Sequence, residues 1–343
     1  MRSIFFSLLL ASTLSLAQAP DPSAAIVQYD KPDREQFLAQ GAKKEGEVVV
    51  YTSLIQEDLI SLSNAFEKKY GVKVKGWRAG SEKVLQRSVT EARANRNDAD
   101  VIETNGPELE AVYREKVLQT LKSPHLKDLM PQAIRPHGQW VGTRINMFVQ
   151  SYNTTLVKKD EVPKSYADLA NPRWKGRLGI EAEDEDWFAM VVTELGEAKG
   201  LAIFRDIAKN GFSVRKGHTL LAGLVASGEI PFALTTYSHG AEKQKQKGAP
   251  VEWYAIPPAI GRANGVAITK KPPHPHAAAL FADFILSPEG QAILEKGGYV
   301  PANVKVANPA QKLPLKFVDP ALVLDQSDKW KKLYDEIVLR NGK

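Results

Sequence analysis

A repeated alternation of short apolar segments with amphipathic segments constrains this chain more than any other feature. Residues 47–51 form a compact β-branched run typical of a buried strand, and residues 72–77 alternate apolar and polar side chains. Between them, apolar residues recur at helical spacing until Gly71, a residue type that commonly ends helices. The same order continues with a helix after Ser81 and a strand at residues 100–103. This order predicts a parallel sheet that is covered by helices on both faces.

A second series of the same kind begins after an extended segment near residues 144–152. Strands are predicted at residues 178–180, 230–234 and 251–255, with helices between them. Residues 265–268 again have the apolar strand pattern of the first series. One α/β unit is therefore interrupted by another. We predict a first lobe at residues 42–143 and 262–343, a second lobe at residues 150–256, and a hinge near residues 144–149 and 257–261.

The first 19 residues have the layout of a secretory signal. Arg2 precedes an apolar run at residues 4–10, and small residues end the segment at Ala19. We predict that residues 1–19 are a signal peptide that is cleaved on secretion. The sequence contains no cysteine, so we expect no disulfide bond and no thiolate metal site.

The charge is mildly positive and evenly spread. The formal net charge is +6, and the lysines at residues 243–247 are typical of one solvated helix face. Nucleic acid is therefore not expected as a partner. A mild positive balance would help to attract an anionic small-molecule ligand.

The loops that follow the predicted strands are the candidate binding site. In an open parallel sheet, ligands bind beyond the carboxyl ends of the strands, where the next helices present free backbone N–H groups. Two such loop sets across a hinge would form a cleft. The candidate ligand-binding residues are Thr52, Ser53, Gly80, Ser81, Asn105, Arg144, Glu183, Gly217, His218 and Tyr237.

Several of these residues also have structural interpretations. Ser81 is placed to cap the helix that follows it, and Asn105 precedes a glycine as in many turns. The acidic stretch at residues 181–186 is typical of a helix start, with Asp184 or Asp186 as the cap. Its alternative role is to turn one carboxylate toward the cleft.

At this point the sequence resembles a known family. The segments GEVVVYTS (46–53), AFEKKYGV (65–72), YADLANPRWKGR (166–177), VASGE (225–229), SPEG (287–290) and YVPAN (299–303) are similar to those of periplasmic iron(III)-type solute-binding proteins of ABC importers. The resemblance covers residues 42–303. It implies an α/β, two-lobed type II periplasmic-binding fold, in which each lobe is a mostly parallel sheet flanked by helices and two crossover strands join the lobes.

The ligand pattern of that family is only partly present. Ferric-binding members typically carry two adjacent tyrosines in the loop that matches residues 234–239, and here Tyr237 stands alone. The His or Glu ligand of the first strand end has no match in Thr52-Ser53. The sequence therefore favours a small organic or phosphorylated anion. A ferric-type metal bound by Glu183, His218 and Tyr237 is the alternative.

The expected function is that of a periplasmic, monomeric substrate-binding component that serves an inner-membrane ABC permease. No enzymatic activity and no cofactor are expected, because the sequence has no G-x-S-x-G elbow, no H-E-x-x-H helix and no cysteine nucleophile. Two alternatives use the same cleft. One is a secreted hydrolytic enzyme with a Ser53–His218 pair, and the other is a ligand sensor.

Overall fold

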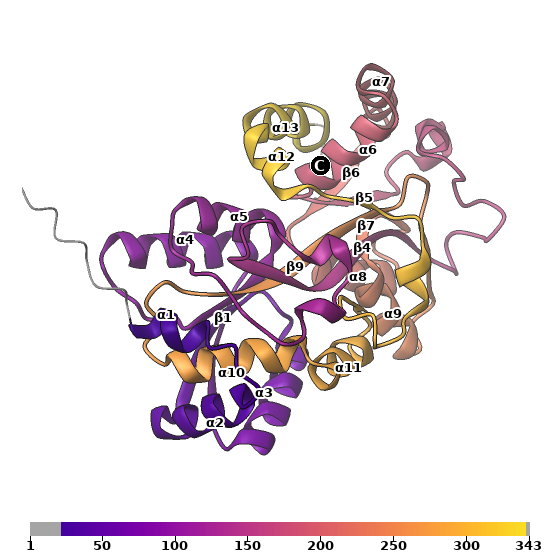
Figure 1. The fold of residues 1–343 in the computed structure, drawn as a ribbon. Helices are drawn as coiled ribbons and strands as arrows, with labels where there is room; N and C mark the ends of the chain where they lie inside the picture. Colours follow the sequence, from indigo (N-terminus) through magenta and orange to yellow (C-terminus); the bar gives the residue numbers. More distant parts are fainter. Residues whose placement is uncertain (1–21, 341–343) are drawn as a thin grey trace, which may run out of the picture.

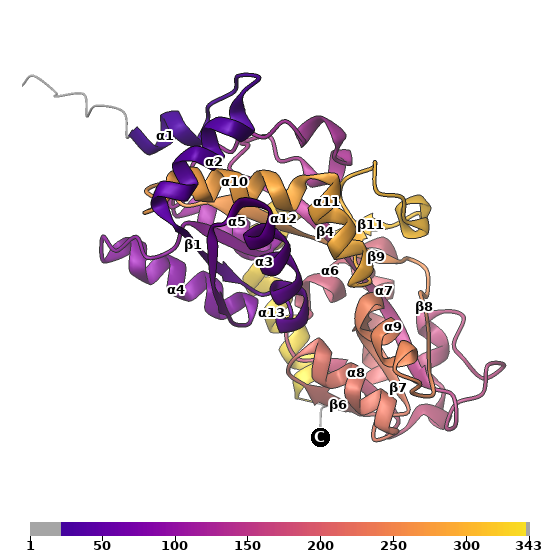
Figure 2. The same cartoon turned by 90° about the horizontal axis from the view of Figure 1, so that it is seen from below.

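The computed structural model describes residues 22–340 and shows two α/β lobes that share one curled sheet (Figures 1 and 2). The predicted signal peptide lies outside the described residues. The strand order is β2-β1-β3-β9-β4-β7-β5-β6, while β10 and β8 pair with β4, and β11 pairs with β9. Strand β4 therefore carries the sheet from the first lobe into the second.

The first lobe is built on three parallel strands. They are β1 (Glu47–Thr52), β2 (Lys73–Arg78) and β3 (Val101–Asn105). The helices that cover them are α2 (Arg34–Glu45), α3 (Gln56–Tyr70), α4 (Ser81–Arg93), α5 (Gly106–Arg114), α10 (Pro275–Leu286) and α11 (Pro288–Lys296).

The predicted spacing of α3 is confirmed. Leu59, Leu62 and Phe66 are buried on one face, and Gly71 ends the helix with a φ of 71°, a conformation that glycine adopts without strain.

The second lobe repeats this plan. Its strands are β5 (Leu178–Glu181), β6 (Phe212–Arg215), β7 (Phe232–Tyr237) and β8 (Val251–Tyr254). Its helices are α6 (Glu185–Glu194), α7 (Glu197–Ala208), α8 (His218–Ser227) and α9 (Ser238–Gln246). Strand β5 is parallel to β6 and β7, as predicted. Trp187 is fully buried among Tyr166, Phe188 and Phe204, so it belongs to the core of this lobe.

Two long antiparallel strands cross between the lobes. They are β4 (Trp140–Asn153) and β9 (Ile260–Ile268), and every residue of both is buried. Of the predicted hinge segments, residues 144–149 lie within β4 and residues 257–261 reach the start of β9. Strands β4 and β9 pair with each other and pass from one lobe to the other. Polar side chains on these two strands therefore lie between the lobes.

The ends of the described chain pack differently from the predicted lobe boundaries. Helices α1 (Pro22–Val27) and α2 precede residue 42, yet Val27 and Leu38 are part of the first-lobe core. After β10 (Val300–Pro301) and β11 (Lys316–Phe317) come α12 (Pro320–Asp325), α13 (Ser327–Tyr334) and the π-helix Asp335–Leu339. Trp330 and Tyr334 pack in the core of the second lobe, although the sequence analysis assigned this segment to the first. The short 3₁₀ segments are Leu126–Asp128, Pro131–Ala133, Tyr166–Ala170, Pro172–Trp174 and Pro309–Lys312.

Within residues 22–340, no single helix is long and apolar enough to cross a membrane. Helices α10 and α11 reach that length and composition only as a pair, with a bend of 61° between them.

Candidate functional site

A cavity of about 700 Å³ lies between the lobes at the carboxyl ends of their strands. This volume is within the range of about 300–1,000 Å³ that small-ligand sites occupy. Most of the predicted site residues line it: Ser53, Gly80, Ser81, Asn105, Arg144, Glu183, Gly217, His218 and Tyr237. The structure therefore brings together residues that are up to 184 positions apart, from Ser53 to Tyr237.

Thr52 is the exception among the predicted site residues. It is 1% exposed, its hydroxyl donates to Glu103 Oε2 at 2.5 Å, and the same hydroxyl accepts the N–H of Leu54 at 2.9 Å. Thr52 therefore holds the β1–α3 loop from beneath and does not line the cavity. Its neighbour Ser53 does, and the hydroxyl of Ser53 accepts a hydrogen bond from Thr104 Oγ1 at 3.0 Å.

Helices α4 and α5 of the first lobe begin at the cavity. The N-cap of α4 is Gly80 and not Ser81, which is the first helical residue, so no side chain caps this helix. Asn105 is the N-cap of α5, yet its side chain accepts a hydrogen bond from Asn264 Nδ2 at 2.8 Å instead of capping the helix. The positive ends of both helices therefore face the cavity without side-chain caps.

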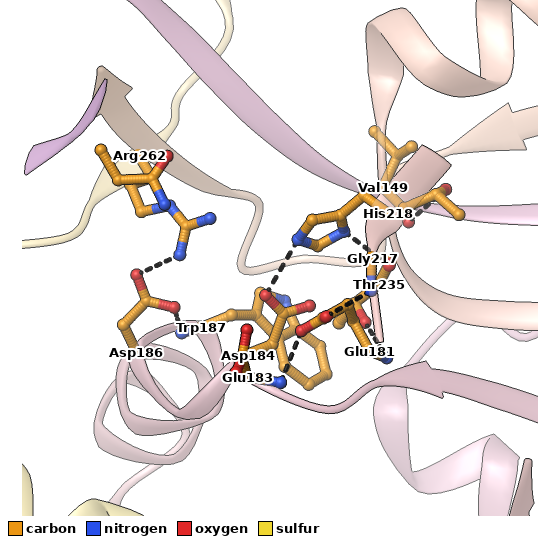
Figure 3. Close-up of polar contacts among 12 residues, drawn as sticks. Val149, Glu181, Glu183, Asp184, Asp186, Trp187, Gly217, His218, Thr235 and Arg262 are labelled. Carbon is orange, nitrogen blue, oxygen red and sulfur yellow. Dashed lines mark hydrogen bonds and ion pairs between the residues drawn. The ribbon is translucent and has the colours of Figure 1, made fainter. Parts of the chain in front are cut away.

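The second-lobe wall is formed by the β5–α6 loop and the start of α8 (Figure 3). Glu181 accepts the N–H of Gly217 through Oε1 at 2.8 Å and the N–H of Glu183 through Oε2 at 2.5 Å. His218 places Nε2 3.2 Å from Asp184 Oδ1 and Nδ1 3.3 Å from the carbonyl oxygen of Thr235. The two loops are thus joined through partly buried polar contacts.

Negative charge dominates this wall. Burial and the nearby Asp184 carboxylate raise the pKa of Glu181 above its ordinary value. Burial opposes a charge on His218, but the carboxylates of Asp184 and Glu181 outweigh it and raise the pKa of His218 above 6.5. The carboxylates of this wall therefore favour a positive charge beside them, and they favour the protonated form of His218.

Glu181, Asp184 and His218 can hold a metal ion together. Each offers one ligand atom, and these atoms lie within 4.8 Å of one another. Asp184 is 0% exposed, and its Oδ2 has no hydrogen-bond partner among the described residues. A carboxylate oxygen has two lone pairs, so the backbone bonds to Glu181 leave room for a ligand on each of its oxygens.

The predicted metal alternative of Glu183, His218 and Tyr237 shares only His218 with this cluster. Glu183 lines the cavity, but its carboxylate binds Lys216 and is 45% exposed, so it is not part of the metal-capable cluster. The spacing of Glu181 and Asp184 was the missed signal. Glu181 ends β5, and Asp184 occupies the N-cap position of α6 without a side-chain cap hydrogen bond, so both acids lie at the strand end.

Tyr237 ends β7 beside this cluster. It is 7% exposed, and its hydroxyl has no hydrogen-bond partner within the part of the chain that the structure describes. Its ring centroid lies 3.7 Å from that of His218. An unpartnered buried hydroxyl costs stability, so its position at a cavity wall makes Tyr237 a candidate ligand contact.

The crossing strands supply two buried arginines. Arg144 on β4 is ion-paired with Glu103, and Arg262 on β9 donates to Asp186 Oδ2 at 2.7 Å. Both line the cavity, and the Nε of each has no hydrogen-bond partner among residues 22–340. The sequence analysis missed Arg262, because its position on the second crossing strand becomes visible only when β9 is paired with β4.

His239 and Tyr299 were also missed. His239 lies in the first turn of α9 in the second lobe, and its ring centroid lies 4.1 Å from that of Tyr299 in the first lobe. Burial, with the positive charges of Arg144 and Lys243, holds the pKa of His239 well below 6.5. The imidazole of His239 is therefore neutral at pH 7.

Two α/β lobes, two crossing strands and a polar cavity between the lobes define a binding protein that encloses a small solute. The sequence agrees with this class, because residues 99–331 match the family described as bacterial extracellular solute-binding protein. The chain belongs to this family.

Curated relatives cover most of the chain. The "Fe(3+)-binding periplasmic protein" of Serratia marcescens is 26% identical over 294 residues, which are 82% of this chain and 87% of the relative. "Iron uptake protein A1" of Synechocystis sp. is 29% identical over 332 residues, which are 88% of this chain and 87% of the relative. The resemblance to iron(III)-type periplasmic binding proteins is confirmed.

Solved structures confirm the two-lobed fold. Iron-bound HitA from Pseudomonas aeruginosa superposes with a TM-score of 0.74 at 24% identity, covering 85% of this chain and 99% of that one. The periplasmic binding protein AfuA from Actinobacillus pleuropneumoniae, with exogenous fructose-6-phosphate bound, gives a TM-score of 0.75 at 24% identity, covering 85% and 98%. The two proteins hold different ligands, because HitA is iron-bound and AfuA holds fructose-6-phosphate.

Proposed function

We propose that this solute-binding protein captures a hard, ferric-type metal cation in the interlobe cavity and delivers it to an inner-membrane ABC permease. One observation carries the proposal. Glu181, Asp184 and His218 bring two carboxylates and an imidazole within 4.8 Å of one another, on a cavity wall whose buried Asp184 has an unpartnered oxygen. Carboxylate oxygen and imidazole nitrogen are suitable donors for such a cation.

The proposed mechanism is capture by closure of the lobes. The lobes that carry β1–β3 and β5–β7 move about β4 and β9, close to the predicted hinge at residues 144–149 and 257–261. The second lobe offers the acidic cluster, and the first offers Ser53, Ser81 and Asn105 from the opposite wall. A closed, loaded form differs in shape from the open form, so a permease can distinguish the two.

The relatives support both the cargo and the compartment. Two of them are named for ferric iron or iron uptake, and one is named as periplasmic. We propose the same location for this chain, reached through the signal peptide at residues 1–19, and a monomeric state. The metal is the transported ligand, which the protein binds and then releases.

The test compares two neighbouring acids of one loop. Metal content is measured on the purified protein, and ferric nitrilotriacetate is titrated into the metal-free protein. Asp184→Asn is expected to weaken binding by more than about 100-fold, because changes outside the ligand shell alone cost about 10–100-fold. Glu183→Gln removes a carboxylate that pairs with Lys216 and is expected to bind nearly as the parent does. Equal affinities for the parent and Asp184→Asn would overturn the metal assignment.

A small anion is the second candidate, and the two buried arginines favour it. Arg144 and Arg262 line the cavity, and the buried guanidinium Nε of each is unpartnered in the described chain. Titration with inorganic phosphate and fructose-6-phosphate under the same conditions separates the candidates. Tight binding of either anion without metal, unaffected by Asp184→Asn, would favour the anion.

Catalysis is the third candidate function for the same cavity. In the first lobe, Ser53 accepts a hydrogen bond from Thr104. In the second lobe, His218 is paired with Asp184. We propose binding without turnover. Recovery of unchanged ligand after prolonged incubation with the protein is the expected result.

A further inference from the structure

The C-terminal segment, residues 319–339, connects the two lobes outside the crossing strands (Figure 1). Its α12 lies beside α5 of the first lobe. Arg114 on α5 donates through Nη1 to Asp325 Oδ1 at 2.7 Å and through Nη2 to the carbonyl oxygen of Ala321 at 3.3 Å. We call residues 319–339 the C-terminal strap.

The other end of the strap is fixed in the second lobe. Trp330 and Tyr334 pack edge-on against Phe188, with ring centroids 6.2 Å and 5.5 Å from it. Lys329 Nζ lies 2.6 Å from a carboxylate oxygen of Glu197 on α7. The aromatic contacts are buried, so this end of the strap is part of the second-lobe core.

One hydrogen bond joins the C-terminal strap to the start of the β5–α6 loop. The hydroxyl of Tyr334, which is 2% exposed, donates to the carbonyl oxygen of Glu181. The other polar groups of Glu181 are also bound. Its N–H donates to Thr235 Oγ1 at 3.0 Å, and its two carboxylate oxygens accept the N–H groups of Glu183 and Gly217. Of these partners, Tyr334 alone comes from outside the second-lobe sheet and its strand-end loops.

We propose that Tyr334 is a positioning residue for the cavity, and that the C-terminal strap holds the β5–α6 loop in its ligand-ready form. The inference rests on the proposed function for the identity of the ligand, but not for the contact itself. A ligand group binds more tightly when its rotamer and backbone are fixed beforehand, because less conformational entropy is lost on binding. Tyr334 fixes the backbone of Glu181 at the point where the chain leaves β5 for Asp184.

The test removes one hydroxyl and uses a matched control. Tyr334→Phe keeps the ring and its packing on Phe188 but deletes the donor to Glu181. Tyr254→Phe deletes a hydroxyl that donates to the carbonyl oxygen of Pro163 at 2.8 Å, also in the second lobe. With ferric nitrilotriacetate as the probe, Tyr334→Phe is expected to weaken binding about threefold to tenfold, as one lost hydrogen bond allows. Tyr254→Phe is expected to leave binding unchanged.

A second measurement needs no ligand. Amide hydrogen exchange of residues 182–184 in the metal-free protein is expected to be faster in Tyr334→Phe than in Tyr254→Phe or the parent. A parent that fails to bind iron overturns the proposed function, and the exchange result then decides the positioning role alone. Unchanged exchange at residues 182–184 in Tyr334→Phe overturns the positioning role, as does equal binding in a parent that does bind iron.

Discussion

Lys243 on α9 donates to both carboxylate oxygens of Asp58 on α3, at 2.9 Å and 3.0 Å, and so joins the second lobe to the first. The two side chains are 20% and 9% exposed. Lys243 lines the cavity, so the pair lies at its edge. Asp58 and Lys243 are thus placed to hold the two walls together when a ligand is enclosed.

Breaking this pair is expected to shift the protein toward its open form. Lys243→Met should weaken ligand binding about threefold to tenfold, because affinity falls with the fraction of protein in the binding-competent state. Small-angle scattering should show a larger radius of gyration for the metal-free variant. The control is Lys245→Met on the same helix, which breaks a pair with Glu252 inside the second lobe at 2.7 Å. If both variants lose affinity equally, the interlobe pair has no role in closure.

Tyr237→Phe should separate binding from stability. The Tyr237 hydroxyl is buried and lacks a partner in the described chain, so its removal should leave the unfolding free energy unchanged or raise it by up to about 1 kcal/mol. Ligand affinity should fall by about tenfold or more. Chemical denaturation of the metal-free protein and titration of the probe measure the two effects. A variant that is clearly less stable would show that the hydroxyl has a structural partner.

The arrangement of the sheet was readable from the sequence because it depends on local patterns. The β-branched run of β1 and the spacing of α3 each report which face of an element is buried, and both were confirmed. Since parallel strands end at one edge, the strand-end loops could be named before their contacts were known. That rule placed Ser53, His218 and Tyr237 at a common cavity.

The rest depended on contacts between distant segments. Glu183 and Asp184 are adjacent acids, and only the turn after β5 decides that Asp184 is buried beside His218 while Glu183 pairs with Lys216. Arg262 becomes a site residue through the pairing of β9 with β4. Helix α13 packs in the core of the second lobe through Trp330, and its amphipathic pattern alone does not indicate which lobe it joins.

His239 should make the protein less stable in mild acid. Burial and the charges of Arg144 and Lys243 hold its folded pKa below the unfolded value of about 6.5. As the pH falls below about 6.5, His239 binds a proton in the unfolded chain but not in the folded chain. The free energy of unfolding therefore decreases. At pH 5 this loss is at most about 2 kcal/mol.

The measurement is denaturant unfolding at pH 7.5 and pH 5. His239→Gln should lose less stability over this interval than the parent, because glutamine does not titrate. The exposed fraction of His239 is 7%, so solvent screening is small. A parent and variant with the same loss would show that other groups cause the acid sensitivity.

The pair of Arg262 and Asp186 makes the sharpest stability prediction and also tests the anion candidate. Their side chains are 7% and 4% exposed. Asp186→Asn leaves a buried guanidinium without its counter-charge and should cost about 3–5 kcal/mol of unfolding free energy. Asp206→Asn breaks an exposed pair with Lys209 and should cost less than about 1 kcal/mol.

Phosphate should restore part of the stability of Asp186→Asn if the cavity admits an anion to Arg262, since binding to the folded state alone raises its stability. Equal melting temperatures of Asp186→Asn with and without phosphate would mean that no anion reaches Arg262, and the metal would then be the better supported ligand.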